Sequence, residues 1–144
     1  MTILLLILGL LMFIGLVVIH ELGHFYVARR GGVEVEEFGL GFPPNIFTFK
    51  AKTDKILPKG TPIAINWIPL GGYVRFSGDE NAASVPDQND LSAMKRAIIA
   101  REGEAAVKRY FHFKPVWQRA LIAVAGPMAN FILAILIMAA VAAR

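Results

Sequence analysis

The sequence has 144 residues, of which 56% are hydrophobic and only 18% are charged, and its net charge is +4. Soluble domains carry about one quarter charged residues, so this composition excludes a disordered tail and favours a membrane protein. Cysteine is absent, which excludes disulfides and thiolate metal sites and leaves His, Asp and Glu as metal ligands.

The first predicted element is a membrane-spanning helix within residues 1–30. Residues 2–19 carry no charge, and a helix of that length reaches about 27 Å, close to the thickness of a hydrocarbon core. A signal peptide is the alternative, but no basic segment precedes the apolar run and no small-residue cleavage site follows it. The helix continues instead into His20-Glu21-Leu22-Gly23-His24, which places ionisable groups at membrane depth, where they indicate function.

Residues 31–77 are predicted to form a membrane-associated β region of several short strands. The stretch from Ile63 to Ile68 is too apolar for a fully solvated sheet, so we expect paired strands that contact lipid beside the helices. Turns are expected at the glycines and prolines of this region, namely Gly39, Gly41, Pro43, Pro44, Pro58, Gly60 and Pro69.

Residues 78–90 are predicted to be a polar linker, and residues 91–119 an amphipathic, interfacial helix region. Leu91, Met94 and Ile98 follow helical spacing, with Asn89 or Asp90 as the expected N-cap. The aromatic residues that follow favour a membrane interface, and they are Tyr110, Phe111, Phe113 and Trp117.

The second predicted span covers residues 120–144, which are uncharged between Arg119 and Arg144. Within it, Gly126-Pro127 predicts a kink packed against protein, and Asn130 is expected to face inward. Ala125 and Ala129 form a small-residue face that suits close helix contact.

The basic residues set the expected topology. Fourteen of the fifteen lie between Arg29 and Arg119, and those at the two flanks place the loop in the cytoplasm and both chain ends on the opposite side. The loop's cations are interleaved with ten acidic residues and do not indicate nucleic-acid binding. The predicted fold class is a mainly α membrane protein, with two transmembrane helices joined by a cytoplasmic loop that holds a membrane-associated β-hairpin and an amphipathic helix.

His20, Glu21 and His24 form an H-E-x-x-H motif. On a helix, positions i and i+4 share one face, so the two imidazoles are predicted to ligate one Zn²⁺ ion while Glu21 moves protons in peptide hydrolysis. A catalytic zinc site normally has three protein ligands. His112 is interpreted as an interfacial residue, with ligation the less favoured option, so the third ligand is expected outside this chain.

Two alternatives stay open for the motif. One is a membrane-embedded metal-binding or transport component, although transporters usually show repeats or further spans. The other is a structural two-span protein without protease activity, which leaves the motif unexplained.

The motifs together resemble the site-2 protease family of intramembrane zinc metalloproteases, most closely its bacterial branch with PDZ domains. They extend over nearly the whole chain and comprise His20 to His24, Gly39 to Phe42, Ile68 to Val74, Lys114 to Arg119 and Ala125 to Phe131. The resemblance implies that His20 and His24 bind Zn²⁺ and that Glu21 is the catalytic acid/base. It also implies a membrane-associated hairpin over residues 37–76 that guides substrate, with Gly41, Phe42 and Asn130 as substrate-binding residues.

The resemblance further implies a multi-pass protein of the bacterial inner membrane, with its motif near the cytoplasmic side. Its substrates would be single-span proteins such as anti-sigma factors or signal-peptide remnants, cleaved in regulated intramembrane proteolysis. Two departures are present. Gly41-Phe42-Pro43 stands where family members often have Gly-Phe-Gly, and the family's Leu-Asp-Gly motif with its third zinc ligand is absent. The chain is therefore expected to be the N-terminal part of a longer protease, without the PDZ region, and inactive alone.

Overall fold

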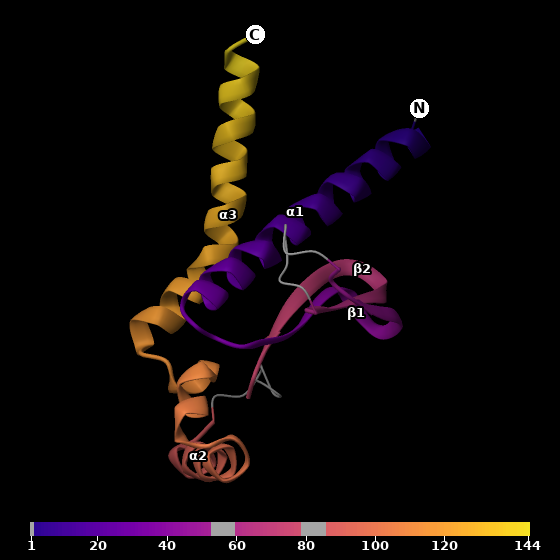
Figure 1. Cartoon of the computed structure of the whole chain (residues 1–144). Helices are drawn as coiled ribbons and strands as arrows, with labels where there is room; N and C mark the ends of the chain where they lie inside the picture. The colour runs from indigo at the N-terminus through magenta and orange to yellow at the C-terminus, as the bar shows by residue number, and fades with distance from the viewer. Residues whose placement is uncertain (1, 53–59, 79–85) are drawn as a thin grey trace.

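The computed structural model describes residues 2–52, 60–78 and 86–144. The elements in chain order are α1 (Thr2–Arg30), β1 (Val35–Lys50), β2 (Pro62–Phe76), α2 (Gln88–Glu102), the 3₁₀ helices η1 (Glu104–Arg109) and η2 (Phe111–Phe113), and α3 (Val116–Ala142). The predicted mainly helical architecture with a small β element is confirmed. Helices α1 and α3 approach each other near the end of α1 and diverge toward the two chain ends, which lie at the same end of the molecule (Figure 1).

Both α1 and α3 are long and apolar enough to cross a membrane. Helix α3 begins at Val116, four residues before the range expected from the sequence, and Pro127 lies inside it. Large apolar side chains on the outer halves of both helices are exposed, as Leu4 and Met138 illustrate, which is the pattern that a lipid surrounding favours. The shared position of the chain ends fits the expected topology, while the side of the membrane on which they lie stays a prediction.

Small residues bring α1 and α3 together. A β-carbon added to Gly23 would collide with the carbonyl oxygen of Ala125 and come within 2.9 Å of the β-carbon of Ala129, so glycine allows this close approach. The predicted small-residue face of the second span is therefore a helix contact.

A hydrogen bond joins the segment before α3 to the residue after α1. Lys114 Nζ donates it to the carbonyl oxygen of Gly31 (2.6 Å), and burial lowers the pKa of Lys114.

Strands β1 and β2 form a two-stranded antiparallel sheet with several changes of register. Because of these changes, residues 38–40 pair with residues 72–74 and also with residues 63–65. Gly41 adopts φ +80° at the bend of β1, and a β-carbon there would lie 2.6 Å from the carbonyl oxygen of Ile68. The strands are thus longer than expected, since the residues predicted as turns, Gly39, Gly41, Pro43, Pro44 and Pro69, lie within β1 or β2, although the chain does bend at Gly41. Gly60 lies in a turn, and Pro58 lies outside the described residues.

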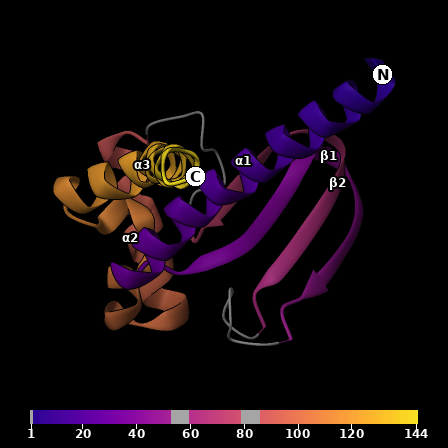
Figure 2. The same ribbon diagram turned by 90° about the horizontal axis from the view of Figure 1, so that it is seen from above.

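The sheet packs on one side of α1 and α3 on another (Figure 2). Phe25 of α1 is buried against Phe38 of β1, with ring centroids 6.1 Å apart in an edge-to-face arrangement. Helix α1 therefore lies between the sheet and α3. In its last turns, one face contacts the sheet and the neighbouring face contacts α3.

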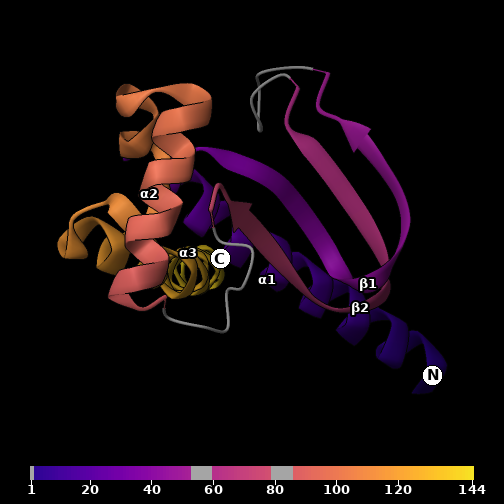
Figure 3. The same ribbon diagram turned by 90° about the horizontal axis from the view of Figure 1, so that it is seen from below.

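The segment predicted as one interfacial helix region, residues 91–119, is divided. Helix α2 begins at Gln88, and Asp87, rather than Asn89 or Asp90, is its N-cap, because Asp87 Oδ1 accepts a hydrogen bond from the Asp90 backbone (2.8 Å) in a reciprocal capping box. The helix ends at Gly103, and Tyr110 is buried against Ile98 rather than placed at an interface. Helix α2 lies across the direction of α3 (Figures 1 and 3), and the predicted linker falls largely on residues 79–85, outside the described residues.

Candidate metal centre

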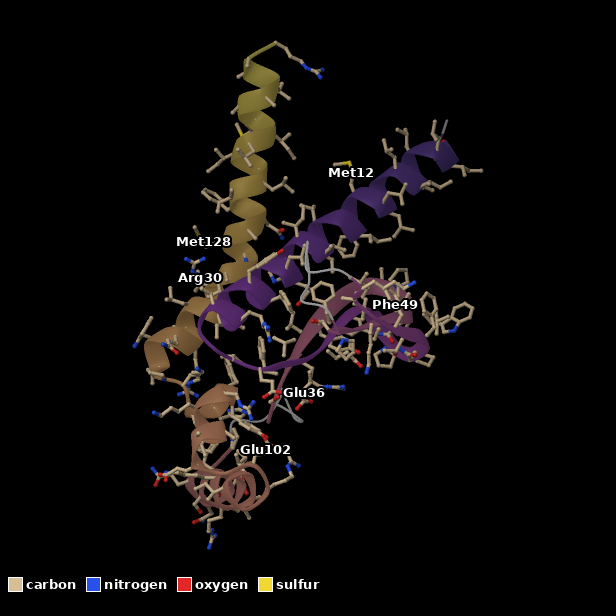
Figure 4. The ribbon with its side chains drawn as sticks, in the orientation of Figure 1. Met12, Arg30, Glu36, Phe49, Glu102 and Met128 are labelled. Carbon is tan, nitrogen blue, oxygen red and sulfur yellow. The ribbon has the colours of Figure 1, made fainter. Side chains whose placement is uncertain are left out.

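His20 and His24 lie one turn apart on α1 and project toward α3. Their Nε2 atoms are 3.2 Å apart and their ring centroids 4.8 Å apart, so the two imidazole edges face each other. Figure 4 marks this region of the molecule by Arg30 at the end of α1 and Met128 of α3. The spacing of the H-E-x-x-H motif thus yields the pair of neighbouring nitrogens that the sequence predicted.

A backbone carbonyl of α3 fixes the orientation of His24. Nδ1 of His24 lies 2.6 Å from the carbonyl oxygen of Ile122, 98 residues away in sequence. Because a carbonyl can only accept, Nδ1 carries the proton, and Nε2 keeps its lone pair. This is the second partner that metal-binding histidines usually have.

Asn130 lies beside the other imidazole. Its amide nitrogen is 3.4 Å from Nδ1 of His20, and its buried amide oxygen has no hydrogen-bond partner among the described residues. The expectation that Asn130 faces inward is confirmed, while its contact with substrate stays a prediction.

The geometry around the two imidazoles fits a zinc ion. Zinc–nitrogen bonds of about 2.0–2.1 Å in a tetrahedral arrangement place two ligand nitrogens about 3.3 Å apart, and the observed separation is 3.2 Å. A β-carbon added to Gly126 of α3 would collide with Nε2 of His24 and come within 2.7 Å of Nε2 of His20. Glycine at position 126 therefore lets the backbone of α3 pack directly against the two nitrogens that would bind the metal.

Glu21 faces the sheet rather than α3. A β-carbon on Gly72 of β2 would lie 2.9 Å from Cγ of Glu21, so the side chain packs where α1 meets the sheet. Since Glu21 directly follows His20 on the helix, its carboxylate belongs to the face adjacent to the imidazole pair. This position suits a proton carrier that does not ligate the metal.

The described ranges 2–52, 60–78 and 86–144 contain no group of three His, Cys, Asp or Glu residues that could hold a metal ion. His112 lies in η2, where its ring contacts that of Phe111, and it does not join His20 and His24. The chain thus supplies two candidate ligands for this site within its described part.

Gly41 and Phe42, predicted as substrate-binding residues, lie at the bend of β1. The carbonyl oxygen of Gly41 accepts a hydrogen bond from the buried Asn66 (2.9 Å), and the ring of Phe42 lies against Gly71. The backbone conformation of the bend is therefore a sufficient reason for glycine at position 41. A role of Gly41 and Phe42 in substrate binding stays a prediction.

Sequence reasoning missed two parts of the site, the carbonyl of Ile122 and the close contact of Gly126 with the imidazoles. Ile122, Gly126 and Asn130 follow each other at intervals of four, which places all three on one face of α3. That periodicity was the available signal, but on its own it does not identify the helix against which the face packs.

Comparisons with known proteins connect this geometry to a family. Residues 8–144 match the model of peptidase family M50. Metalloprotease MmpA of Caulobacter vibrioides is 60% identical over 125 residues, which cover 87% of this chain and 30% of that protein. A putative zinc metalloprotease of Agrobacterium fabrum, Atu1380, is 44% identical over 86% of this chain and 29% of its own length.

The regulator of sigma-E protease RseP of Escherichia coli is 40% identical over 120 residues, which cover 83% of this chain and 21% of that protein. The chain thus spans less than a third of the length of the curated relatives it matches.

Proposed function

Because this chain belongs to peptidase family M50, we propose that it is the N-terminal portion of an intramembrane zinc metalloprotease. The proposed reaction is hydrolysis of peptide bonds in or near the transmembrane segments of membrane proteins, as in regulated intramembrane proteolysis. The proposed substrates are single-span proteins, such as anti-sigma factors or signal-peptide remnants, in the bacterial inner membrane.

The observation that carries the proposal is the pair of Nε2 atoms 3.2 Å apart on a helix long enough to cross the membrane, with Gly126 of α3 packed closely against them. His20 and His24 would hold Zn²⁺. When bound, zinc supplies Lewis acidity that polarises a peptide carbonyl and makes water more acidic. Glu21 would accept the proton of the attacking water and pass it to the leaving amine.

We propose that the third ligand comes from a segment outside this chain. Two imidazoles are fewer than the three protein ligands of ordinary catalytic zinc sites, and the described residues offer no third ligand beside them. The 144-residue chain alone is therefore proposed to be proteolytically inactive.

We further propose that the outer end of the sheet contacts the lipid bilayer. Trp67 is 68% exposed and Leu70 62% exposed, and Phe49 lies at the end of the sheet remote from α2 (Figure 4). An apolar patch of this kind on a protein surface marks an interaction site, and beside two spanning helices the bilayer is the nearest apolar phase. The exposed apolar side chains of this patch are Phe42, Ile46, Phe47, Phe49, Trp67, Ile68 and Leu70.

Cleavage of a single-span reporter tests the proposed function. The full-length protein is reconstituted in lipid vesicles with a substrate carrying a different tag on each side of its span. We expect cleavage within or beside the span, loss of cleavage after treatment with a zinc chelator, and recovery when Zn²⁺ is restored, because hydrolysis needs the ion held by His20 and His24.

A mock-treated sample and a chelator already saturated with zinc serve as controls in this experiment. Cleavage that persists after full removal of zinc would contradict the proposal. Bound zinc without any cleavage would favour the alternative of a metal-binding membrane component, and neither zinc nor cleavage would favour a structural protein.

A further inference from the structure

The two imidazoles of the site have different partners at Nδ1. His24 faces the carbonyl oxygen of Ile122, which can only accept, so its tautomer is set by the backbone of α3. His20 faces the side-chain amide of Asn130, which offers an NH₂ donor at one end and an oxygen acceptor at the other. The tautomer of His20 therefore depends on which end of this amide it meets.

The two orientations of the amide have opposite consequences. With the nitrogen of Asn130 toward His20, as at 3.4 Å in this structure, Nδ1 of His20 accepts and its Nε2 carries the proton. That proton then points at the lone pair of His24 Nε2, 3.2 Å away, and the two histidines hydrogen-bond to each other. With the amide turned by half a rotation, the oxygen accepts from Nδ1–H of His20, and both Nε2 atoms then keep their lone pairs for a metal.

We propose that Asn130 is a positioning residue that accepts a hydrogen bond from Nδ1–H of His20 and thereby prepares Nε2 of His20 for zinc. This inference rests on the proposed function, in which His20 ligates Zn²⁺. The buried amide oxygen, which has no partner among the described residues, is the acceptor that the role requires, and it lies on the same short side chain as the nitrogen already at His20. In this arrangement each histidine donates a hydrogen bond from Nδ1–H to an oxygen of α3. His20 donates to the side chain of Asn130, and His24 donates to the carbonyl of Ile122.

The alternative role for Asn130 is that of a donor, either to His20 or to a substrate carbonyl. Substitution by aspartate separates the two roles, because an ionised aspartate accepts hydrogen bonds but cannot donate them. Leucine removes both capacities at nearly the same volume. The comparison of Asn130→Asp with Asn130→Leu therefore distinguishes an acceptor from a donor and from a merely space-filling residue.

The experiment measures the zinc affinity of the full-length protein in detergent by competition with a chromophoric chelator, using wild type and the two variants. We expect Asn130→Leu to weaken zinc binding by about 10–100-fold, and Asn130→Asp to bind zinc as tightly as wild type or more tightly. The melting temperatures of the zinc-free proteins are measured in parallel, and Asn130→Ala replaces Asn130→Leu if the latter does not fold.

An Asn130→Asp variant that loses as much affinity as Asn130→Leu would overturn the acceptor role and indicate a donor. Unchanged affinity in Asn130→Leu would overturn any positioning role. A wild-type protein that binds no zinc would overturn the proposed function as well, which distinguishes that failure from the failure of this inference.

Discussion

Substituting Glu21 with glutamine is expected to reduce peptide hydrolysis by at least about a hundredfold while leaving the zinc content unchanged. Glutamine keeps the shape of the side chain but cannot accept a proton from water. Glu21 packs against Gly72 of the sheet, on the face adjacent to the imidazoles, so its removal should not disturb the pair of nitrogens. The measurement is the initial rate of reporter cleavage in vesicles, together with zinc per protein from mass spectrometry.

Glu36→Gln is the matched control for this substitution. Glu36 lies in β1 and forms a surface ion pair with Arg75 (3.5 Å), so its neutralisation should leave the rate nearly unchanged. Retention of more than a tenth of the wild-type rate in Glu21→Gln would assign the proton transfer to another group. Loss of zinc in that variant would instead indicate that Glu21 helps to bind the metal.

Substituting Gly126 with alanine is expected to weaken zinc binding and reduce activity. The new methyl group would collide with Nε2 of His24 and come within 2.7 Å of Nε2 of His20, so both imidazoles would have to move. Neither neighbour can yield easily, because His24 is tied to Ile122 by a 2.6 Å hydrogen bond and the backbone of Ala125 already touches Gly23. We expect zinc affinity to fall by at least about tenfold, measured by the same chelator competition.

Gly15→Ala controls for a general effect of alanine in a spanning helix, since among the described residues a β-carbon at Gly15 would meet nothing within 4 Å beyond the adjoining backbone of its own helix. The cause can also be checked by combination. In a His24→Ala background the nearer of the two collision partners is gone and only Nε2 of His20 remains, so Gly126→Ala should cost less thermal stability there than in the wild type. Wild-type zinc affinity in Gly126→Ala would show that the close contact of Gly126 with the two imidazoles does not govern metal binding.

The parts of the structure that the sequence predicted are those decided by local pattern. Two uncharged stretches gave two long helices, and i, i+4 spacing brought His20 and His24 to one face. The partners of these histidines on α3 could not be predicted, because they depend on how two helices about 100 residues apart in sequence pack. Ala125 and Ala129 indicated a helix contact but not that Gly23 would be on its other side.

The structure differs in detail from the predictions for the β region and for the segment after α2 where tertiary contacts outweigh local signals. Glycines and prolines of β1 predicted turns between short strands, and the chain does bend at Gly41, where Asn66 donates a 2.9 Å hydrogen bond to its carbonyl oxygen, but pairing continues on both sides of the bend. Tyr110 suggested an interfacial ring, but its hydroxyl donates to Glu102 (2.8 Å) and its ring closes the small core formed with Ile98. In both places the deciding partner lies in another element.

The central claim is that the imidazoles of His20 and His24 together hold one zinc ion, and the zinc content of the purified full-length protein tests it most directly. The measurement compares wild type with His20→Ala, His24→Ala and His112→Ala, the last being the remaining histidine of the chain. The account predicts about one zinc per protein in wild type and in His112→Ala, and almost none in the other two. Full zinc content in His20→Ala or His24→Ala, or its loss in His112→Ala alone, would contradict the claim.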